Sequence, residues 1–155
     1  MVSIIRRAAG RLALGLAVLA GSAFAVQAAP IVLPTGLNPG DSYRLAFVSS
    51  ALTGAEFSDI NVYNTFVNNL ANSVTELSAL SLSWTAIVST SAVHARDNTN
   101  TNPGTSTGAP IYLLDGVTMI ADDNADLWDG GIDNPLNIDE NGNVVAATQA
   151  WTGTT

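Results

Sequence analysis

The chain contains no cysteine and, in 155 residues, only one histidine and five basic residues, all of them arginine. The absence of cysteine excludes disulfide frameworks, thiolate nucleophiles and cysteine-ligated zinc. Three arginines lie in the first eleven residues, so Arg44 and Arg96 alone oppose all 13 acidic residues that follow, a net charge of −11. A body this acidic cannot neutralise phosphates, which excludes nucleic acids as partners, and an anionic membrane surface would repel it.

The first 28 residues have the three regions of a secretory signal peptide. Met1–Arg11 is basic, Leu12–Ala20 is a short apolar run, and small residues follow, with Val26–Ala28 or Ala23–Ala25 in the arrangement that signal peptidase accepts. The apolar run is shorter than the roughly 20 residues that a bilayer requires, which argues against a membrane anchor. The sequence therefore predicts that residues 1–28 are removed, that no membrane span remains in the mature chain, and that the protein is exported to the periplasm, the cell surface or the medium.

The remaining chain is long and apolar enough for one domain with its own core. A Pro/Gly-rich linker is predicted over residues 29–41, and the alternation in Ser42–Ser50 predicts a half-buried strand. Apolar residues at helical spacing predict a helix over Asp59–Asn72, capped by Ser58. Trp84–Ser89 is typical of another strand, and Trp84 is expected in the core.

Short apolar segments separated by turn residues make up the second half of the chain. Asp97–Gly108 is rich in Asn, Thr and Gly and is predicted to be a loop. Four short apolar segments follow: Ile111–Leu114, Val117–Ile120, Leu136–Ile138 and Val144–Ala147. Asp115-Gly116 and Asn141-Gly142 are typical of tight hairpin turns between them. One helix between short strands and long loops predicts an α+β fold.

Eight acidic residues crowd between Asp115 and Glu140, mixed with asparagines. Oxygen ligands of this kind suit calcium. The candidate ligands are Asp122, Asp126, Asp129, Asp133 and Asp139. An EF-hand loop is excluded because the position of its obligatory glycine holds Leu127 or Val144. The alternative is a solvated acidic surface in which Asp and Asn serve as turn residues.

Catalytic constellations are weakly supported. His94 lies near Ser89, Ser91 and Asp97 in the chain, but no nucleophile elbow surrounds these serines. Acid pairs of the glycosidase type occur in any acidic loop and carry little information. Trp128 has apolar neighbours and is expected, like Trp84, to lie in the core rather than to stack on sugars. We therefore expect that the protein is not an enzyme.

Several short blocks occur in an informative order. They are YRLAFVSSALTG (43–54), WTAIVSTS (84–91), ARDN (95–98), APIYLLDG (109–116), IADDNADLWDG (120–130), NPLNI (134–138) and WTGT (151–154). This succession resembles exported bacterial proteins that end in a PEP-CTERM tail read by an exosortase, and it is similar to the endostatin module of collagens. The resemblance covers residues 42–155 and implies a C-type-lectin-like domain with an irregular antiparallel sheet and long loops. Both relatives continue beyond the late Trp-x-Gly, which implies that the last strands of the module are missing here.

The resemblance, the leader and the acidic body together predict an exported, non-catalytic binding or structural protein of the cell envelope or extracellular matrix. The disulfides, histidine zinc site and basic heparin-binding face of the collagen module do not carry over, because this chain lacks the residues for them. Expected partners are an extracellular polysaccharide or an envelope protein. The alternative is a calcium-dependent, lectin-type carbohydrate-binding module, with a secreted hydrolase as a remote third. Missing strands would leave Ser42–Ser50 with an unpaired edge.

Overall fold

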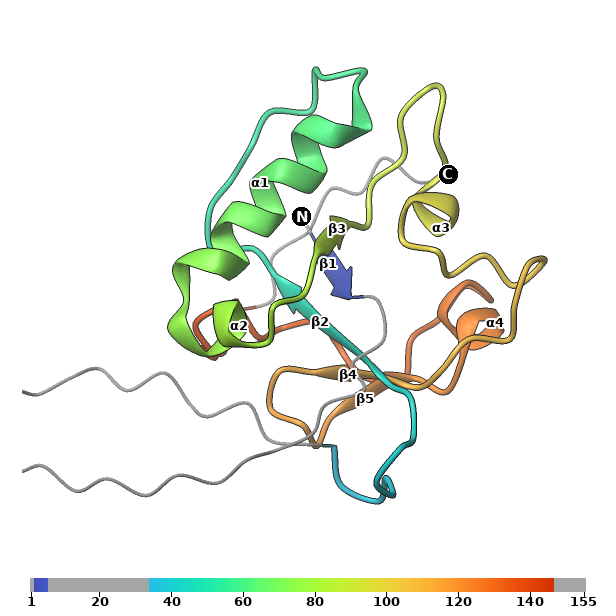
Figure 1. Cartoon of the computed structure of the whole chain (residues 1–155). Helices are drawn as coiled ribbons and strands as arrows, with labels where there is room; N and C mark the ends of the chain where they lie inside the picture. The colour runs from blue at the N-terminus through green and yellow to red at the C-terminus, as the bar shows by residue number, and fades with distance from the viewer. Residues whose placement is uncertain (1, 6–33, 147–155) are drawn as a thin grey trace, which may run out of the picture.

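A computed structural model describes residues 2–5 and 34–146, which form five strands and four helices (Figure 1). In chain order these elements are β1 (Val2–Ile5), β2 (Arg44–Val48), α1 (Ile60–Ser73), α2 (Thr75–Ala79), β3 (Trp84–Ala86), α3 (Ala95–Asn98), β4 (Ile111–Leu113), β5 (Met119–Ala121) and α4 (Asn124–Leu127). The protein is therefore a small domain of mixed α and β structure, and the predicted α+β class is confirmed at that level.

The strands form one sheet in the order β3-β1-β2-β4-β5. β1 runs antiparallel to both of its neighbours, and β4 and β5 form an antiparallel hairpin, but β2 and β4 are parallel. The sheet is thus mixed, and the expectation of an antiparallel sheet was wrong. Parallel neighbours need a long crossover connection, and here α1, α2, β3 and α3 lie between β2 and β4 in the chain.

The strand β1 lies inside the segment that the sequence predicts to be a signal peptide. Val2 pairs with Val48 of β2, and Ile5 pairs with Trp84 of β3. Cleavage near residue 28 would therefore remove a strand from the interior of the sheet. The cleavage sites themselves, and the Trp151 block, lie outside the described residues.

All five residues of β2 are buried, although the sequence predicted a half-buried strand. Neighbours on several sides cover the strand. The Phe47 ring lies edge-on to Trp84 at 4.9 Å between centroids, while Arg44 donates to the carbonyl oxygens of Thr99 and Asn100. A strand inside a sheet with both faces covered loses the alternation of exposed and buried positions.

Helix α1 begins one residue later than predicted, and Asp59 rather than Ser58 is its N-cap. The Asp59 carboxylate accepts a hydrogen bond from the Asn61 N–H at 2.9 Å, which satisfies one of the free donors of the first turn. The buried stripe of the helix consists of Tyr63, Val67 and Ala71. Its helical spacing explains why the sequence located this element correctly.

The side of α1 that carries asparagines closes the outer edge of β3. Asn68 Oδ1 accepts from the Trp84 N–H at 3.1 Å, and Asn64 Oδ1 accepts from the Ala86 N–H at 2.9 Å. Asn98 of α3 donates to the Ala86 carbonyl at 2.7 Å and exchanges amide hydrogen bonds with Asn64. Side-chain amides thus take the place of a further strand at this edge.

The predicted hairpin turn at Asp115-Gly116 is confirmed. Gly116 has a φ of 66°, and its carbonyl accepts from the Thr35 N–H at 3.1 Å, which attaches the described part of the predicted linker to the domain. The turn at Asn141-Gly142 is also present, with a φ of 79° at Gly142. It lies between Ile138 and Val144, which form an isolated antiparallel bridge rather than the two strands expected.

Acid should weaken the Asp115 turn. Burial raises the pKa of the Asp115 carboxyl, but hydrogen bonds from the Thr118 hydroxyl and from the N–H groups of Thr118 and Val117 outweigh it, and the net pKa is lowered. The stabilisation that the ionised Asp115 carboxylate provides is therefore fully present above the unfolded-state pKa of about 3.9. It is lost as the pH falls through the lower folded-state pKa. We expect Asp115→Asn to cost about 0.5–1 kcal/mol at pH 7 and almost nothing at about pH 2. Chemical denaturation of both proteins across this range measures the difference, and a constant difference would contradict the assignment.

Candidate functional site: the paired polar loops

Two polar segments lie side by side on the part of the molecule away from α1. We call residues 99–108 and 122–134 the paired polar loops. Asn124 joins them, because its backbone N–H donates to the Thr107 carbonyl at 2.8 Å and its side-chain amide donates to the Ser106 carbonyl at 2.9 Å. Trp128 Nε1 adds a bond to Thr101 Oγ1 at 3.0 Å. The pairing builds one continuous surface from segments about 20 residues apart in the chain.

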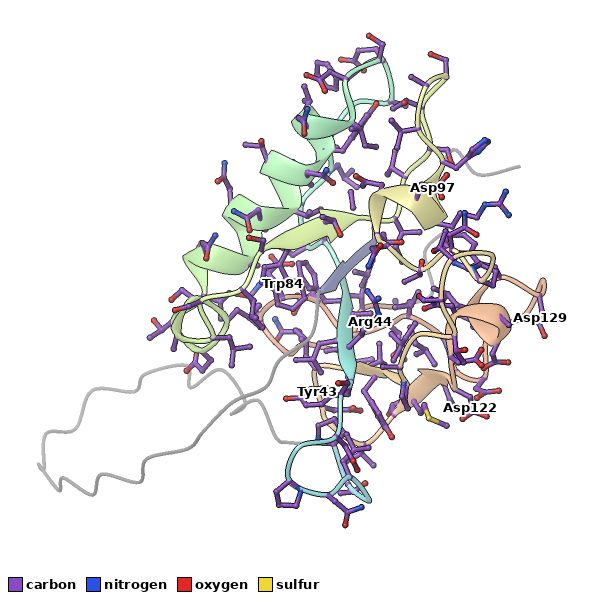
Figure 2. All side chains as sticks on the ribbon, turned by 45° about the vertical axis from the view of Figure 1, so that its right-hand side comes forward. Tyr43, Arg44, Trp84, Asp97, Asp122 and Asp129 are labelled. Carbon is purple, nitrogen blue, oxygen red and sulfur yellow. The ribbon has the colours of Figure 1, made fainter. Side chains whose placement is uncertain are left out.

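The first loop starts from a Schellman-type end of α3. The Asn100 N–H donates to the Asp97 carbonyl at 3.1 Å, the Thr101 N–H donates to the Arg96 carbonyl at 2.8 Å, and Asn100 has a φ of 55°. The Arg44 guanidinium approaches from β2 and donates to the Thr99 and Asn100 carbonyl oxygens at 3.1 and 2.8 Å. A buried cation thus fixes the point where the loop leaves the helix (Figure 2).

The second loop is shaped by α4 and its acidic residues. Asp123 is the N-cap, and its carboxylate accepts from the N–H groups of Ala125 and Asp126 at 2.7 and 3.0 Å. Asp126 in turn accepts from the Asp122 N–H at 2.7 Å. Asp129 accepts from the Gly131 N–H at 3.0 Å. These carboxylates hold the loop in its shape through hydrogen bonds to the backbone.

The close approach of the two loops depends on Gly108. Its φ is +91°, and a Cβ at this position would collide with the Asn124 side chain. Gly130 has a similar φ of +106° but no atom near an added Cβ. Replacing either glycine with alanine would strain the backbone by about 1–2 kcal/mol. Only Gly108→Ala would also disturb the contact between the loops.

We therefore expect Gly108→Ala to destabilise the protein by at least about 1 kcal/mol more than Gly130→Ala. Chemical denaturation measures both values against the unsubstituted chain. Amide exchange at Asn124 should accelerate in the first variant only. Equal losses of unfolding free energy in the two variants would show that the loops do not meet at Gly108.

Four of the five predicted calcium ligands lie on the second loop, and the fifth does not. Asp139 is buried in the turn at Asn141-Gly142, where its carboxylate accepts from the N–H groups of Asn141 and Asn143 at 2.9 and 2.8 Å. The other four are Asp122, Asp126, Asp129 and Asp133. Within residues 2–5 and 34–146, the structure brings together no group of three or more His, Asp or Glu side chains that could hold a metal ion. Calcium binding stays a prediction.

Two of the residues considered for a catalytic triad, Ser89 and Asp97, are hydrogen-bonded to other groups. Ser89 Oγ accepts from the Ala95 N–H at 2.9 Å, and Asp97 Oδ1 accepts from the Asn102 amide at 2.6 Å. His94 occupies the N-cap position of α3. The Ser89 and Asp97 side chains thus stabilise the start of α3 and the loop that follows the helix.

Sequence reasoning missed two buried charged groups, Arg44 beside the first loop and Glu140 elsewhere in the domain. Arg44 and Glu140 are 5% and 3% exposed, and Glu140 accepts hydrogen bonds from the N–H and the hydroxyl of Ser50. A signal was available for the arginine, because a charged residue inside an otherwise apolar strand is seldom buried without partners. Trp84 is fully buried as predicted, whereas Trp128, whose indole N–H donates to Thr101 Oγ1, is only partly buried.

Comparisons of the chain with models of protein families, with curated proteins and with solved structures find no significant match. No helix in the described part of the chain has the length and apolar character needed to cross a membrane.

Proposed function

We propose that the chain is an exported, non-catalytic binding or structural protein of the cell envelope or extracellular matrix. As part of the same proposal, its domain is C-type-lectin-like, and the paired polar loops are the surface that meets a partner. The leader and the acidic body support export to a compartment outside the cytoplasm. Fold alone does not determine function, so the argument depends on the loops.

The observation that carries the proposal is that the paired polar loops are ordered by their own hydrogen bonds while carboxylates remain exposed on them. Asp122 and Asp129 lie on the same side of the molecule, away from α1 (Figure 2). Both are exposed, and the paired polar loops also carry hydroxyl and amide groups. A surface held in shape before binding loses little entropy when it binds. Carboxylates and amides can accept hydrogen bonds from the hydroxyl groups of a polysaccharide.

A sedimentation experiment tests this proposal. The exported protein is mixed with extracellular polysaccharide from the producing cells, and the fraction that sediments with the polymer is measured. The double variant Asp122→Asn, Asp129→Asn should bind at least several-fold less. The matched control is Asp41→Asn, Glu56→Gln, which removes the same charge from exposed positions outside the loops and should bind normally. Equal binding by all three proteins would contradict the role of the loops.

The second candidate function, a calcium-dependent lectin, is favoured by the four candidate ligands on the second loop, Asp122, Asp126, Asp129 and Asp133. It predicts that calcium raises the melting temperature and that a chelator abolishes polymer binding, because a ligand stabilises the state that binds it. The leading proposal predicts binding that is unchanged by the chelator. Release of shortened polymer chains would contradict both and favour a hydrolase.

A further inference from the structure

The position of β1 in the sheet has a consequence for the exported protein. β1 lies between β2 and β3 and is antiparallel to both, with Ile4 opposite Ala46 on one side and Thr85 on the other. All of β1 belongs to the predicted leader. Removal of the leader therefore empties a strand position that is bounded on two sides.

The backbone groups that face this position follow from the alternation of the neighbouring strands. The N–H groups of Arg44 and Val48 donate away from β1, to the carbonyls of Pro110 and Ile138 at 2.8 and 2.9 Å. The intervening Leu45 and Phe47 therefore direct their N–H and C=O groups toward β1. On β3, Trp84 and Ala86 bond outward to asparagines of α1, so Thr85 faces β1.

The outer edges of the sheet, in contrast, have partners. Asparagine side chains close β3, as described above. At the other edge, the Ile120 carbonyl of β5 accepts from the Asp133 N–H at 3.0 Å, and the Met119 carbonyl accepts from the Asn134 amide at 2.7 Å. Among the described residues, the backbone groups of the sheet that lose a hydrogen-bond partner when the leader is removed are thus those that face the β1 position.

β2 and β3 cannot close the gap by pairing with each other without rearranging the core. Two strand spacings separate them, roughly 10 Å, which is too far for a hydrogen bond. The Phe47 and Trp84 rings meet edge-on at 4.9 Å and are 0% and 1% exposed. Drawing the strands together would displace this buried pair.

The surroundings define what fits the position. Ala46, Phe47, Trp84 and Ala86 are all buried, so a charged residue inserted between them would lose its hydration without gaining an ionic partner. The segment that occupies the position is uncharged, contains three β-branched residues in four, and is followed by Arg6 and Arg7. Basic residues beside the strand also suit a processed body whose net charge is −11.

We propose that the β1 position is a strand-acceptor site. In the exported protein it receives an extended segment of a partner polypeptide, uncharged and β-branched over about four residues, flanked by basic residues and antiparallel to β2 and β3. Recognition of this type draws its affinity from main-chain hydrogen bonds and its specificity from the side chains of the added strand. The inference depends on the export and leader cleavage proposed above.

A peptide experiment on the exported protein tests the site. The probe is a synthetic peptide with the sequence of Met1–Arg7, and the control carries Ile4→Pro, which removes an N–H and cannot sit inside a sheet. We expect the probe to raise the melting temperature and to slow amide exchange at Leu45, Phe47 and Thr85 at least tenfold. Exchange at Trp84 and Ala86, which bond to α1, should change little, and the proline peptide should bind at least tenfold more weakly.

The result that would overturn the proposal is an exported protein whose Leu45, Phe47 and Thr85 amides are already protected and whose melting temperature the probe does not change. Another part of the same chain would then fill the position. A second measurement uses the uncleaved full chain, in which Ile4→Pro should lower the melting temperature and added probe should restore it; no change would contradict the strand position itself. An exported protein that retains Met1 would contradict the proposed leader cleavage rather than the acceptor geometry.

Discussion

Replacing Trp84 with alanine is expected to lower the free energy of unfolding by about 3–5 kcal/mol, among the largest effects of any single substitution in this domain. The indole is 1% exposed, and its ring lies edge-on to Phe47 in the centre of the core. It also stands at the end of β3 that pairs with β1. Truncation would leave a cavity beside the Phe47 ring. Chemical denaturation, followed by circular dichroism, measures the loss.

Two companion substitutions make this result specific. Trp84→Phe should cost much less than the alanine change, because Trp84 Nε1 has no hydrogen-bond partner among the described residues and no such bond is lost. Leu52→Ala serves as the control, because Leu52 is 92% exposed and its truncation should change the unfolding free energy by less than about 0.5 kcal/mol. A Trp84→Ala protein that unfolds like the Leu52→Ala protein would show that the indole is not in the core.

Arg44→Ala is expected to have the second largest effect, a loss of about 1.5–3 kcal/mol, which is typical of removing a charged hydrogen-bond donor from a buried site. The guanidinium donates to the Thr99 and Asn100 carbonyls, which lie at the end of α3 and the start of the first polar loop. Without it these carbonyls lose donors inside the fold. The loss should appear locally as faster amide exchange at Thr101, whose N–H caps α3.

The matched control for this substitution is Arg96→Ala, which removes the same kind of side chain from an exposed position on α3. It should leave both the unfolding free energy and the Thr101 exchange rate nearly unchanged. If both arginine variants behave alike, Arg44 does not anchor the loop.

The local elements were predictable because each carries its own signal. The helical spacing of Tyr63 and Val67 located α1, and the Asp115-Gly116 dipeptide located the β4–β5 turn. The sheet order was not predictable, because no local pattern tells β2 to pair in parallel with β4 across a long crossover. The strand β1 was missed for a different reason. Its residues lie in the basic region of a leader, and a leader is set aside before the fold is considered.

The candidate site was predictable in composition and not in geometry. The sequence showed that Asp122, Asp126 and Asp129 are close in the chain, but it could not show that the Asp126 and Asp129 carboxylates accept hydrogen bonds from N–H groups of the same loop, that of Asp122 among them. The joining role of Asn124 was equally hidden, since it depends on the first loop passing directly over it at Gly108. Contacts between distant segments need three-dimensional information that residue spacing does not contain.

The intact mass of the protein recovered from outside the producing cells tests the central claim, that this chain is exported and that its leader is removed in the process. The account predicts a mass corresponding to a chain that begins at Ala29 or within a few residues of it, with N-terminal sequencing to fix the position. Such a chain would lack Val2–Ile5 and would carry the two arginines and 13 acids counted above. Protein that remains inside the cell, or that is recovered outside with Met1 still present, would contradict it.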